Sequence, residues 1–198
     1  MKRVAILLEN GFEEIEALTP KDVLQRSGII CDLVSTKGEE YVTGTHGTNV
    51  KVDKKLKYIE KNTIVINDDN EKLNSLNDYD MIVLPGGMPG AKNLAENKIV
   101  IEAVREFDKN NKFIAAICAS PALVLPKANV LKERKVTSYP GMENYLKNAN
   151  YSEELVVRDN NLITSRGPAT ALLFAFELVD ALGEDSRKLK EEMLWNLI

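Results

Sequence analysis

Cys118 is the residue of this sequence best suited to covalent chemistry. It lies between the apolar run 113–117 and Ser120-Pro121, a cap residue followed by a proline of the kind favoured in a first helical turn. This arrangement is typical of a strand-to-helix elbow, where backbone N–H groups face the reacting oxygen and the helix N-terminus lowers the pKa of a thiol. The sequence therefore predicts a reactive thiolate at Cys118, with a buried cysteine acting as a small hydrophobe as the alternative.

A thiolate needs a partner that moves protons, and a glutamate is the candidate here. The single histidine, His46, lies in a glycine-rich segment that we expect to be a solvated turn. Glu13, Glu14 and Glu16 follow the first apolar run. A glutamate folded toward Cys118 would be desolvated, which raises its pKa and lets it share a proton with the thiolate. We assign this role to Glu16 and expect Glu13 and Glu14 to form a solvated acidic first turn of a helix.

Gly86 and Gly87 follow another apolar run, 81–84, after Pro85. Such a pair is often only a tight turn, but glycine also lets the backbone approach a ligand closely. The N–H groups of Gly87 and Ala119 would then form an oxyanion hole. The spacing does not match a dinucleotide fingerprint, and the chain has no Walker loop or zinc-protease motif. We therefore expect no cofactor and no metal.

The elements that must position these residues are short apolar runs alternating with helical patterns. The runs 3–8, 31–35, 81–84 and 113–117 are apolar throughout, which is typical of buried parallel strands. Segments 19–26, 99–109 and 169–182 show helical spacing. This alternation predicts an α/β sandwich around a mostly parallel sheet. Ligands bind such sheets beyond the carboxyl ends of the strands, where the residues above would converge.

Three segments depart from that alternation. Residues 41–52 are predicted to form a hairpin with a glycine-rich turn. Residues 60–78 are polar around one strand-like stretch, 63–66, and are predicted to be a surface insertion. Residues 186–198 are predicted to be an amphipathic helix with Leu189, Met193, Leu194 and Leu197 on one side, which packs onto the sheet or forms a dimer contact. We divide the chain into one domain, residues 1–198.

Composition excludes several classes of protein. With 26 Lys and Arg, 30 Asp and Glu and a net charge of -4, the chain lacks the basic surface of a nucleic-acid binder. Two cysteines and one histidine are too few for a disulfide framework or for a structural zinc site, which needs about four ligands. Cys31, inside an apolar run, is predicted to pack in the core. We find no signal peptide and no run of about 18 apolar residues, and expect a cytoplasmic protein that binds neither nucleic acid nor membrane.

Four motifs together resemble the ThiJ/PfpI superfamily, specifically the branch of the parkinsonism-associated protein deglycase DJ-one. They are E-N-G-F-E-E-I-E, D-M-I-V-L-P-G-G, A-A-I-C-A-S-P and I-T-S-R-G-P-A-T, and they occur in the order of that family over nearly the whole chain. The resemblance implies a flavodoxin-like sandwich, a homodimer, a nucleophile at Cys118 and a protonated Glu16. It also implies backbone donors at Gly87 and Ala119, and it makes residues 165–168 scaffold and pocket rim.

Two positions differ from members of that superfamily. The peptidase-like branch has a histidine directly after the cysteine, where this chain has Ala119. Some members have a histidine in a T-x-H-P segment, where this chain has Thr137-Ser138-Tyr139-Pro140. Tyr139 is a pocket-lining candidate, as are Gly86 and Ser120, but an unperturbed pKa near 10 makes tyrosine a poor base. A Cys118–Glu16 pair is the remaining catalytic arrangement.

The resemblance and these residues lead to three hypotheses. The first is a glyoxalase or deglycase that acts on methylglyoxal or related carbonyl adducts through Cys118 and Glu16. The second is an oxidative-stress sensor or holdase-type chaperone in which Cys118 is oxidised, because accessible thiols of low pKa oxidise readily. The third, a cysteine peptidase or amidotransferase-like hydrolase, lacks a histidine base.

Overall fold

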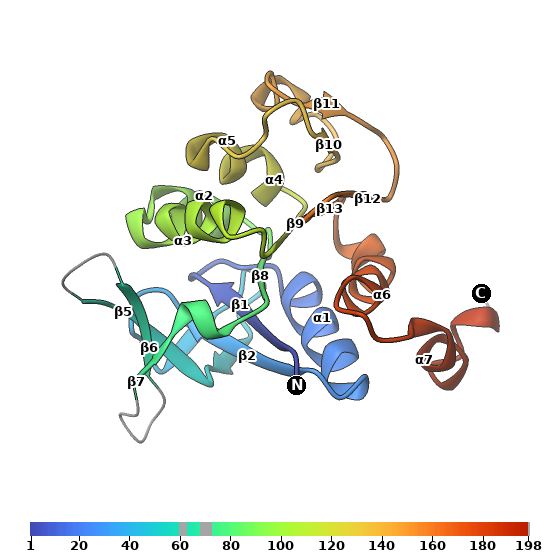
Figure 1. The fold of residues 1–198 in the computed structure, drawn as a ribbon, viewed down its shortest axis with the longest axis horizontal. Helices are drawn as coiled ribbons and strands as arrows, with labels where there is room; N and C mark the ends of the chain where they lie inside the picture. The colour runs from blue at the N-terminus through green and yellow to red at the C-terminus, as the bar shows by residue number, and fades with distance from the viewer. Residues whose placement is uncertain (60–62, 68–72, 198) are drawn as a thin grey trace.

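The central feature of the fold is one twisted sheet with helices on both faces (Figure 1). The computed structural model describes residues 1–59, 63–67 and 73–197. Within these residues, the strands of the main sheet follow the order β12-β13-β9-β8-β1-β2-β5-β6-β7. Their bounds are β1 Arg3–Leu8, β2 Ile30–Ser35, β5 Lys54–Ile59, β6 Thr63–Asn67, β7 Leu73–Ser75, β8 Met81–Leu84, β9 Phe113–Ile117, β12 Val156–Asp159 and β13 Leu162–Ser165.

Five of these strands form a parallel core. β2, β1, β8, β9 and β13 pair side by side in parallel. Numbered by their order in the chain, they follow the arrangement 2-1-3-4-5, which is the flavodoxin-like order. The direction of chain progression reverses between β1 and β8, and a crevice forms at such a point beyond the carboxyl ends of the strands. Residues Glu9 and Pro85 begin the loops that leave these two strands.

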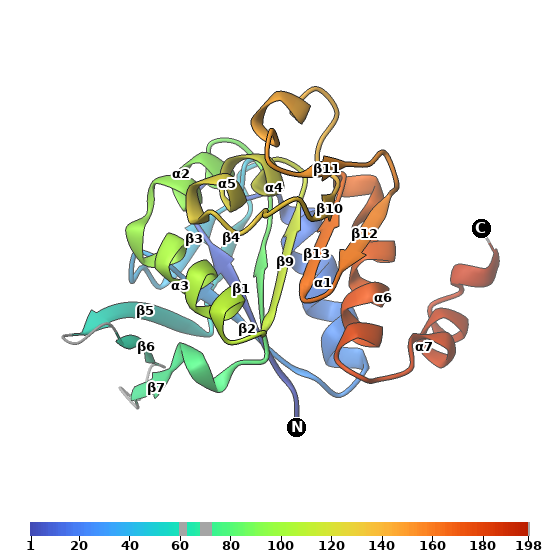
Figure 2. The ribbon, with the colours of Figure 1, turned by 45° about the horizontal axis from the view of Figure 1, so that its top comes forward.

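The helices form two layers that bury opposite faces of the sheet. α1 (Glu14–Arg26) and α6 (Ala171–Ala181) pack together on one face, and α7 (Ser186–Glu192) continues beyond α6 (Figure 2). The other face is covered by α2 (Gly90–Glu96), α3 (Lys98–Lys109), α4 (Ser120–Leu123) and α5 (Leu125–Ala128). Short strand pairs lie outside the main sheet: β3 (Tyr41–Thr43) with β4 (Asn49–Lys51), and β10 (Lys135–Val136) with β11 (Asn150–Tyr151).

Strand β1 shows why the central runs are apolar throughout. Val4, Ile6 and Leu8 belong to the hydrophobic core under α1 and α6. Ala5 and Leu7 belong to the core on the other face. Successive side chains of a strand point to opposite faces, so a strand covered on both sides must be apolar at every position. The predicted α/β sandwich is confirmed, and three of the four predicted runs match the observed strands to the residue.

The first helix begins earlier than its predicted segment, 19–26. α1 starts at Glu14, and Glu13 caps it by accepting a hydrogen bond from the N–H of Glu16 at 2.8 Å. Pro20 lies inside the helix. The sequence boundary is wrong because Thr19-Pro20 resembles a helix start, since proline favours the first turn.

The segment 60–78 differs from the predicted surface insertion where it is described. The predicted strand is present as β6, which pairs antiparallel with β5 and β7 and so extends the main sheet. Its Ile64 and Ile66 are buried in the hydrophobic core. Residues 60–62 and 68–72 of the predicted insertion lie outside the described residues, and a short helical turn, Leu76–Asp78, follows β7. The predicted hairpin at 41–52 is confirmed as β3 and β4.

The C-terminal segment packs on a helix instead of the sheet. Leu189 is buried and Trp195 contacts Phe176 of α6 edge-on, with ring centroids 5.7 Å apart. Leu194 and Leu197 are exposed, and the predicted single helix over 186–198 is wrong. α7 ends at Glu192 and Leu194 has a φ of 60°, which breaks the helical spacing of these side chains. Across the part of the chain that is described, no helix combines the length and apolar character needed to cross a membrane.

Candidate active site

Two loops that leave neighbouring strands are joined at the crevice. The N–H of Glu13 donates to the carbonyl of Gly86 at 3.0 Å, and the N–H of Gly90 donates to the carbonyl of Gly11 at 3.0 Å. Gly87 has a φ of +88°, and a Cβ there would lie 2.4 Å from the nitrogen of Glu13. A glycine is therefore required at this crossing. The loops after β1 and β8 are held in contact, as the sequence predicted for the tips of these strands.

Glu16 points inward from the first turn of α1 and is fully buried. Its Oε2 accepts a hydrogen bond from the N–H of Gly86 at 2.8 Å. Its Oε1 has no hydrogen-bond partner within the described residues. Burial raises the pKa of Glu16 to about 7, against the lowering effect of the hydrogen bonds from Gly86 and Cys118. Glu16 is thus the buried glutamate that the sequence predicted, and it can exchange a proton near neutral pH.

Cys118 forms the expected elbow between β9 and α4. Its φ of 64° places it in the left-handed region, which non-glycine residues seldom adopt. The elbow is held from both sides, because the N–H of Cys118 donates to the carbonyl of Ser165 and its carbonyl accepts from the N–H of Tyr139. The residue is 9% exposed. A strained, locked backbone at a cysteine is typical of a nucleophile on a sharp turn.

Gly86 is the residue that brings Cys118 and Glu16 together. A Cβ on Gly86 would lie 2.6 Å from the Cβ of Cys118, 2.6 Å from Oε2 of Glu16 and 3.0 Å from the Cys118 sulfur. The thiol and the carboxyl are thus close enough for each to shift the pKa of the other. The sequence predicted Gly86 only as a pocket-lining residue. Its role as a hydrogen-bond donor to Glu16 follows from its place after β8, which the sequence did show.

The predicted lowering of the Cys118 pKa is wrong in its net direction. Burial, followed by the adjacent Glu16, raises the pKa of the Cys118 thiol to about 12. The backbone N–H groups of Gly87 and Ala119 act in the opposite sense and stabilise the thiolate. A negative charge on Glu16 opposes a negative charge on the sulfur, so the two groups hold one proton between them near neutral pH. The thiolate then exists only when Glu16 carries that proton.

The helix that follows Cys118 is capped differently from the prediction. Ala119 is the N-cap of α4 and makes no side-chain capping bond. Ser120 is the first helical residue, and its hydroxyl donates to the carbonyl of Pro85 at 2.6 Å. This bond links the elbow to the loop after β8. The local sequence predicted Ser120 as a helix cap. In the structure its hydroxyl instead donates to the carbonyl of Pro85, which belongs to a different loop.

The outer side of the pair is lined by residues from two later loops. Tyr139 is half exposed. A Cβ on Gly167 would lie 3.6 Å from the Tyr139 ring and 4.0 Å from Oε1 of Glu16. The unpaired carboxyl oxygen of Glu16 therefore faces the side formed by Gly167 and Tyr139. Tyr139, a predicted pocket-lining residue, and Gly167, in the predicted rim at residues 165–168, thus lie beside Glu16.

Glu13 and Glu14 are not the solvated acidic turn that the sequence predicted. Both are buried. Oε1 of Glu14 accepts the N–H of His46 at 2.8 Å, and its Oε2 lies 2.8 Å from Nδ1 of that ring. His46, in the turn between β3 and β4, has a side chain that is 73% exposed. In this chain the histidine thus pairs with Glu14 and not with Cys118. Cys31 is buried as predicted, and burial raises its thiol pKa to about 12.

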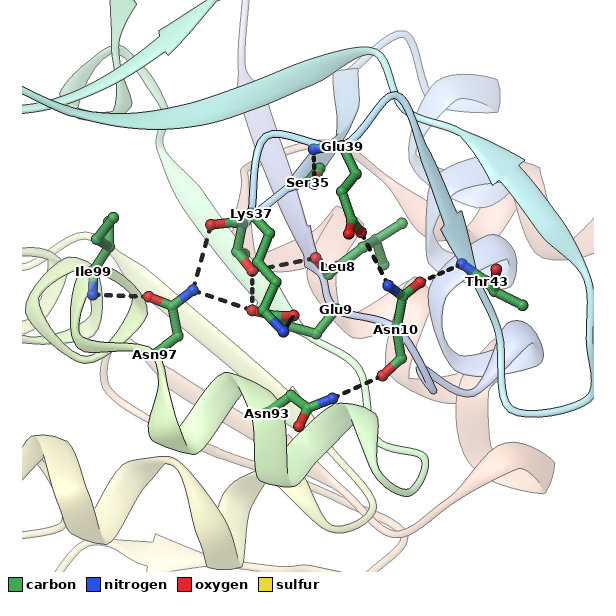
Figure 3. A network of polar contacts seen from close by, with 11 residues as sticks. Leu8, Glu9, Asn10, Ser35, Lys37, Glu39, Thr43, Asn93, Asn97 and Ile99 are labelled. Carbon is green, nitrogen blue, oxygen red and sulfur yellow. Dashed lines mark hydrogen bonds and ion pairs between the residues drawn. The ribbon is translucent and has the colours of Figure 1, made fainter.

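Another buried carboxylate, Glu9, lies where β1 ends. Glu9 accepts hydrogen bonds from the Thr36 hydroxyl and the Asn97 amide, and pairs with Lys37 at 3.1 Å (Figure 3). Lys37 and Asn97 also line a hollow of about 160 Å³ with Asn93 and Glu96. Both oxygens of Glu9 have partners, so its role is to tie the ends of β1 and β2 to the start of α3.

Comparison with known proteins supports the reading of the fold and of the motifs. The model of the DJ-1/PfpI family matches residues 2–181. Protein dj-1beta of Drosophila melanogaster is 35% identical over 91% of this chain and 89% of that protein. The Parkinson disease protein 7 homolog of Danio rerio is 33% identical over the same shares, 91% and 89%. The structure of oxidized Toxoplasma gondii DJ-1 superposes with a TM-score of 0.83 at 31% identity, covering 98% of each chain.

Proposed function

The chain belongs to the DJ-1/PfpI family, and from that premise we propose that it is a cysteine-dependent glyoxalase or deglycase acting on methylglyoxal and related carbonyl adducts. The observation that supports this most is the contact of Cys118 and Glu16 across Gly86. It places the nucleophile, Cys118, and a proton carrier with a pKa of about 7, Glu16, on either side of Gly86. General acid–base catalysis is most efficient when the pKa of the catalytic group is close to the working pH.

The proposed reaction converts methylglyoxal and water to lactate without net oxidation. The Cys118 thiolate attacks the aldehyde carbon, and the carbonyl oxygen takes the proton of Glu16 to give a hemithioacetal. The Glu16 carboxylate then removes the hydrogen from that carbon as a proton, forming an enediolate. It returns this proton to the neighbouring carbon while the hydroxyl proton moves to the neighbouring oxygen, which leaves a thioester. Water cleaves the thioester, which releases lactate and restores the thiol.

Backbone groups supply the charge stabilisation in this scheme. The N–H groups of Gly87 and Ala119 already stabilise negative charge on the sulfur. In the same position they would hold the oxyanion that forms when the thiolate attacks. Removing one such donor typically costs on the order of 10²- to 10³-fold in rate. Because these donors belong to the backbone, their position depends on the Gly86-Gly87 turn and on the elbow. The proposal also includes a homodimer that acts in the cytoplasm.

A lactate assay with methylglyoxal tests this function. We expect the parent chain to form lactate, Cys118→Ala to form none, and Glu16→Gln to be slower by about 10²- to 10⁴-fold. Cys31→Ala is the matched control, because Cys31, the other cysteine of the chain, is buried on β2 and takes no part in the proposed reaction. Lactate formation by Cys118→Ala at the parent rate would rule out the proposed chemistry.

A second candidate is a redox sensor of the stress response that uses the same sulfur. It is favoured by the two backbone N–H groups beside Cys118, which would also hold the oxygens of a sulfinate, and by the description of the Toxoplasma gondii relative as oxidized. Peroxide titration followed by intact mass distinguishes the two. Addition of two oxygens at Cys118 near stoichiometric peroxide, together with no lactate from methylglyoxal, would favour the sensor.

A further inference from the structure

Glu13, Glu14 and His46 bring three potential metal ligands together outside the Cys118–Glu16 pair. An imidazole nitrogen of His46 and one carboxylate oxygen from each glutamate lie within 4.8 Å of one another. The two carboxylates come from the start of α1, and the imidazole comes from the turn between β3 and β4. The grouping is therefore a product of tertiary structure, and it combines oxygen and nitrogen donors.

The two chain segments are held in register by the backbone. The N–H of Gly11 donates to the carbonyl of Thr43, and the N–H of Thr45 donates to the carbonyl of Phe12 at 2.7 Å. The Thr45 hydroxyl also donates to the carbonyl of Met88 at 2.9 Å. These bonds bind the hairpin turn to the loop before α1, so the imidazole and the carboxylates keep their separation.

The Glu14 carboxylate lies under the turn between β3 and β4, and both of its oxygens have partners there. Its Oε1 is held by the backbone N–H of His46 at 2.8 Å. A Cβ on Gly44 would lie 2.4 Å from that oxygen, so only glycine allows the carboxylate to lie under the turn. Its Oε2 faces Nδ1 of His46 at 2.8 Å. A zinc-type cation that replaced the proton between these two atoms would move them from 2.8 Å to about 3.3 Å apart, the separation of two ligands about 2.0 Å from a tetrahedral metal, which a rotation of the exposed His46 ring allows.

The donor types indicate which cation fits. An imidazole nitrogen with two carboxylate oxygens suits zinc and its neighbours among the divalent transition metals, whereas magnesium and calcium prefer oxygen alone. Three protein ligands leave one position open in a tetrahedral site. The partial positive charge of a helix N-terminus, about +0.5, opposes a cation here, but two carboxylates outweigh it.

We propose that Glu13, Glu14 and His46 form a binding site for a divalent transition-metal cation of the zinc type. The site is distinct from the Cys118 pair, because Glu16 accepts its hydrogen bond from Gly86, whereas Glu14 pairs with His46, whose ring is exposed. The sequence led us to expect no metal because it lacks the four ligands of a structural zinc site. A three-ligand site arises only when the hairpin reaches α1.

Calorimetric titration with Zn²⁺ tests the proposal. It is carried out on the full chain with Cys118→Ser, so that the thiol does not bind the metal. We expect one equivalent of Zn²⁺ to bind, and His46→Gln and Glu13→Gln each to weaken binding by at least about tenfold. Glu40→Gln is the matched control, since this exposed glutamate precedes the same hairpin and pairs with Lys51. It removes the same charge and should leave the affinity within about twofold.

A spectroscopic measurement separates metal ligation from a general charge effect. His46 is the single histidine of the chain, so nitrogen coupling from an imidazole in the electron paramagnetic resonance spectrum of bound Cu²⁺ identifies it. We expect this coupling in the Cys118→Ser protein and its loss in His46→Gln. The proposal is overturned if Zn²⁺ does not bind, if His46→Gln binds it as tightly as the parent, or if the Cu²⁺ spectrum is the same in both. The test is independent of any reaction at Cys118.

Discussion

At the scale of single residues, Cys118 and Glu16 act as one titrating unit. Burial raises the pKa of Glu16 to about 7 and that of Cys118 to about 12. Below about pH 7 both groups are protonated, and above it the pair keeps one proton. That proton resides on either group, and the reactive tautomer has it on Glu16 with the sulfur as thiolate. Because the pKa of Cys118 lies above that of Glu16, the thiolate form is the minor tautomer of the pair.

The alkylation rate of Cys118 by iodoacetamide should rise with pH. Loss of the first proton from the pair has a midpoint at about pH 7, and only the form with one proton includes a thiolate. We expect the rate to increase about tenfold between about pH 6 and 8 and then to level off. Mass spectrometry of the modified Cys118 peptide measures it.

Glu16→Gln identifies the group responsible for that profile. The variant removes the shared proton, so the rise near pH 7 should disappear and the rate should follow the ionisation of the thiol alone. Cys31 serves as an internal control within the same digest, because burial keeps its thiol unreactive. A rise near pH 7 that persists in Glu16→Gln would show that another group controls Cys118.

At the scale of elements, the site depends on two turns that are built differently. The Gly86-Gly87 turn has no side chains because Cys118, Glu16 and the Glu13 backbone occupy the space around it. The β9–α4 turn carries a side chain at a positive φ, at Cys118, and is held by bonds to Ser165 and Tyr139. The Gly86-Gly87 turn leaves room for Cys118 and Glu16 to approach each other, and the β9–α4 turn supplies the nucleophile.

Gly86→Ala should remove activity while the protein remains folded. The new methyl group would lie 2.6 Å from both Cys118 and Glu16, so one of these side chains must move. Overpacking of this kind typically costs about 1 to 3 kcal/mol of stability. We expect no detectable lactate formation and a lower midpoint of urea unfolding.

Gly167→Ala is the matched stability control for that variant. Its Cβ would find its nearest atoms at 3.6 to 4.0 Å, which is ordinary contact, and its φ of 169° is extended backbone. Its unfolding free energy should change by less than about 0.5 kcal/mol. Equal stability losses in the two variants would mean that the close contacts at Gly86 do not determine the effect.

At the scale of the whole molecule, the sheet is wider than its parallel core. β5, β6 and β7 continue the sheet past β2, and β6 contributes Ile64 and Ile66 to the hydrophobic core shared with β8 and α3. The segment predicted as a surface insertion therefore adds stability where it is described. The candidate site lies at the opposite side of β1, where β8 and β9 end, so this extension supports the fold without lining the site.

Ile66→Ala tests that role. Truncating a fully buried isoleucine typically costs about 2 to 5 kcal/mol, and Ile66 is 0% exposed. We expect a loss in this range in urea unfolding with a single transition. Lys57→Ala, an exposed change on the adjacent β5, should alter stability by less than about 0.5 kcal/mol. A loss below about 1 kcal/mol for Ile66→Ala would indicate that the extension is peripheral.

The sequence by itself determined the sandwich and the strands β1, β8 and β9, because these depend on local patterns of apolar runs and turns. It also named Cys118, Glu16 and Gly86 as candidates for the site. Tertiary structure alone decided the net pKa of Cys118, the acceptor of the Ser120 hydroxyl and the pairing of Glu14 with His46. Desolvation and hydrogen bonding depend on which distant segments surround a group, and the spacing of residues along the chain carries no record of that.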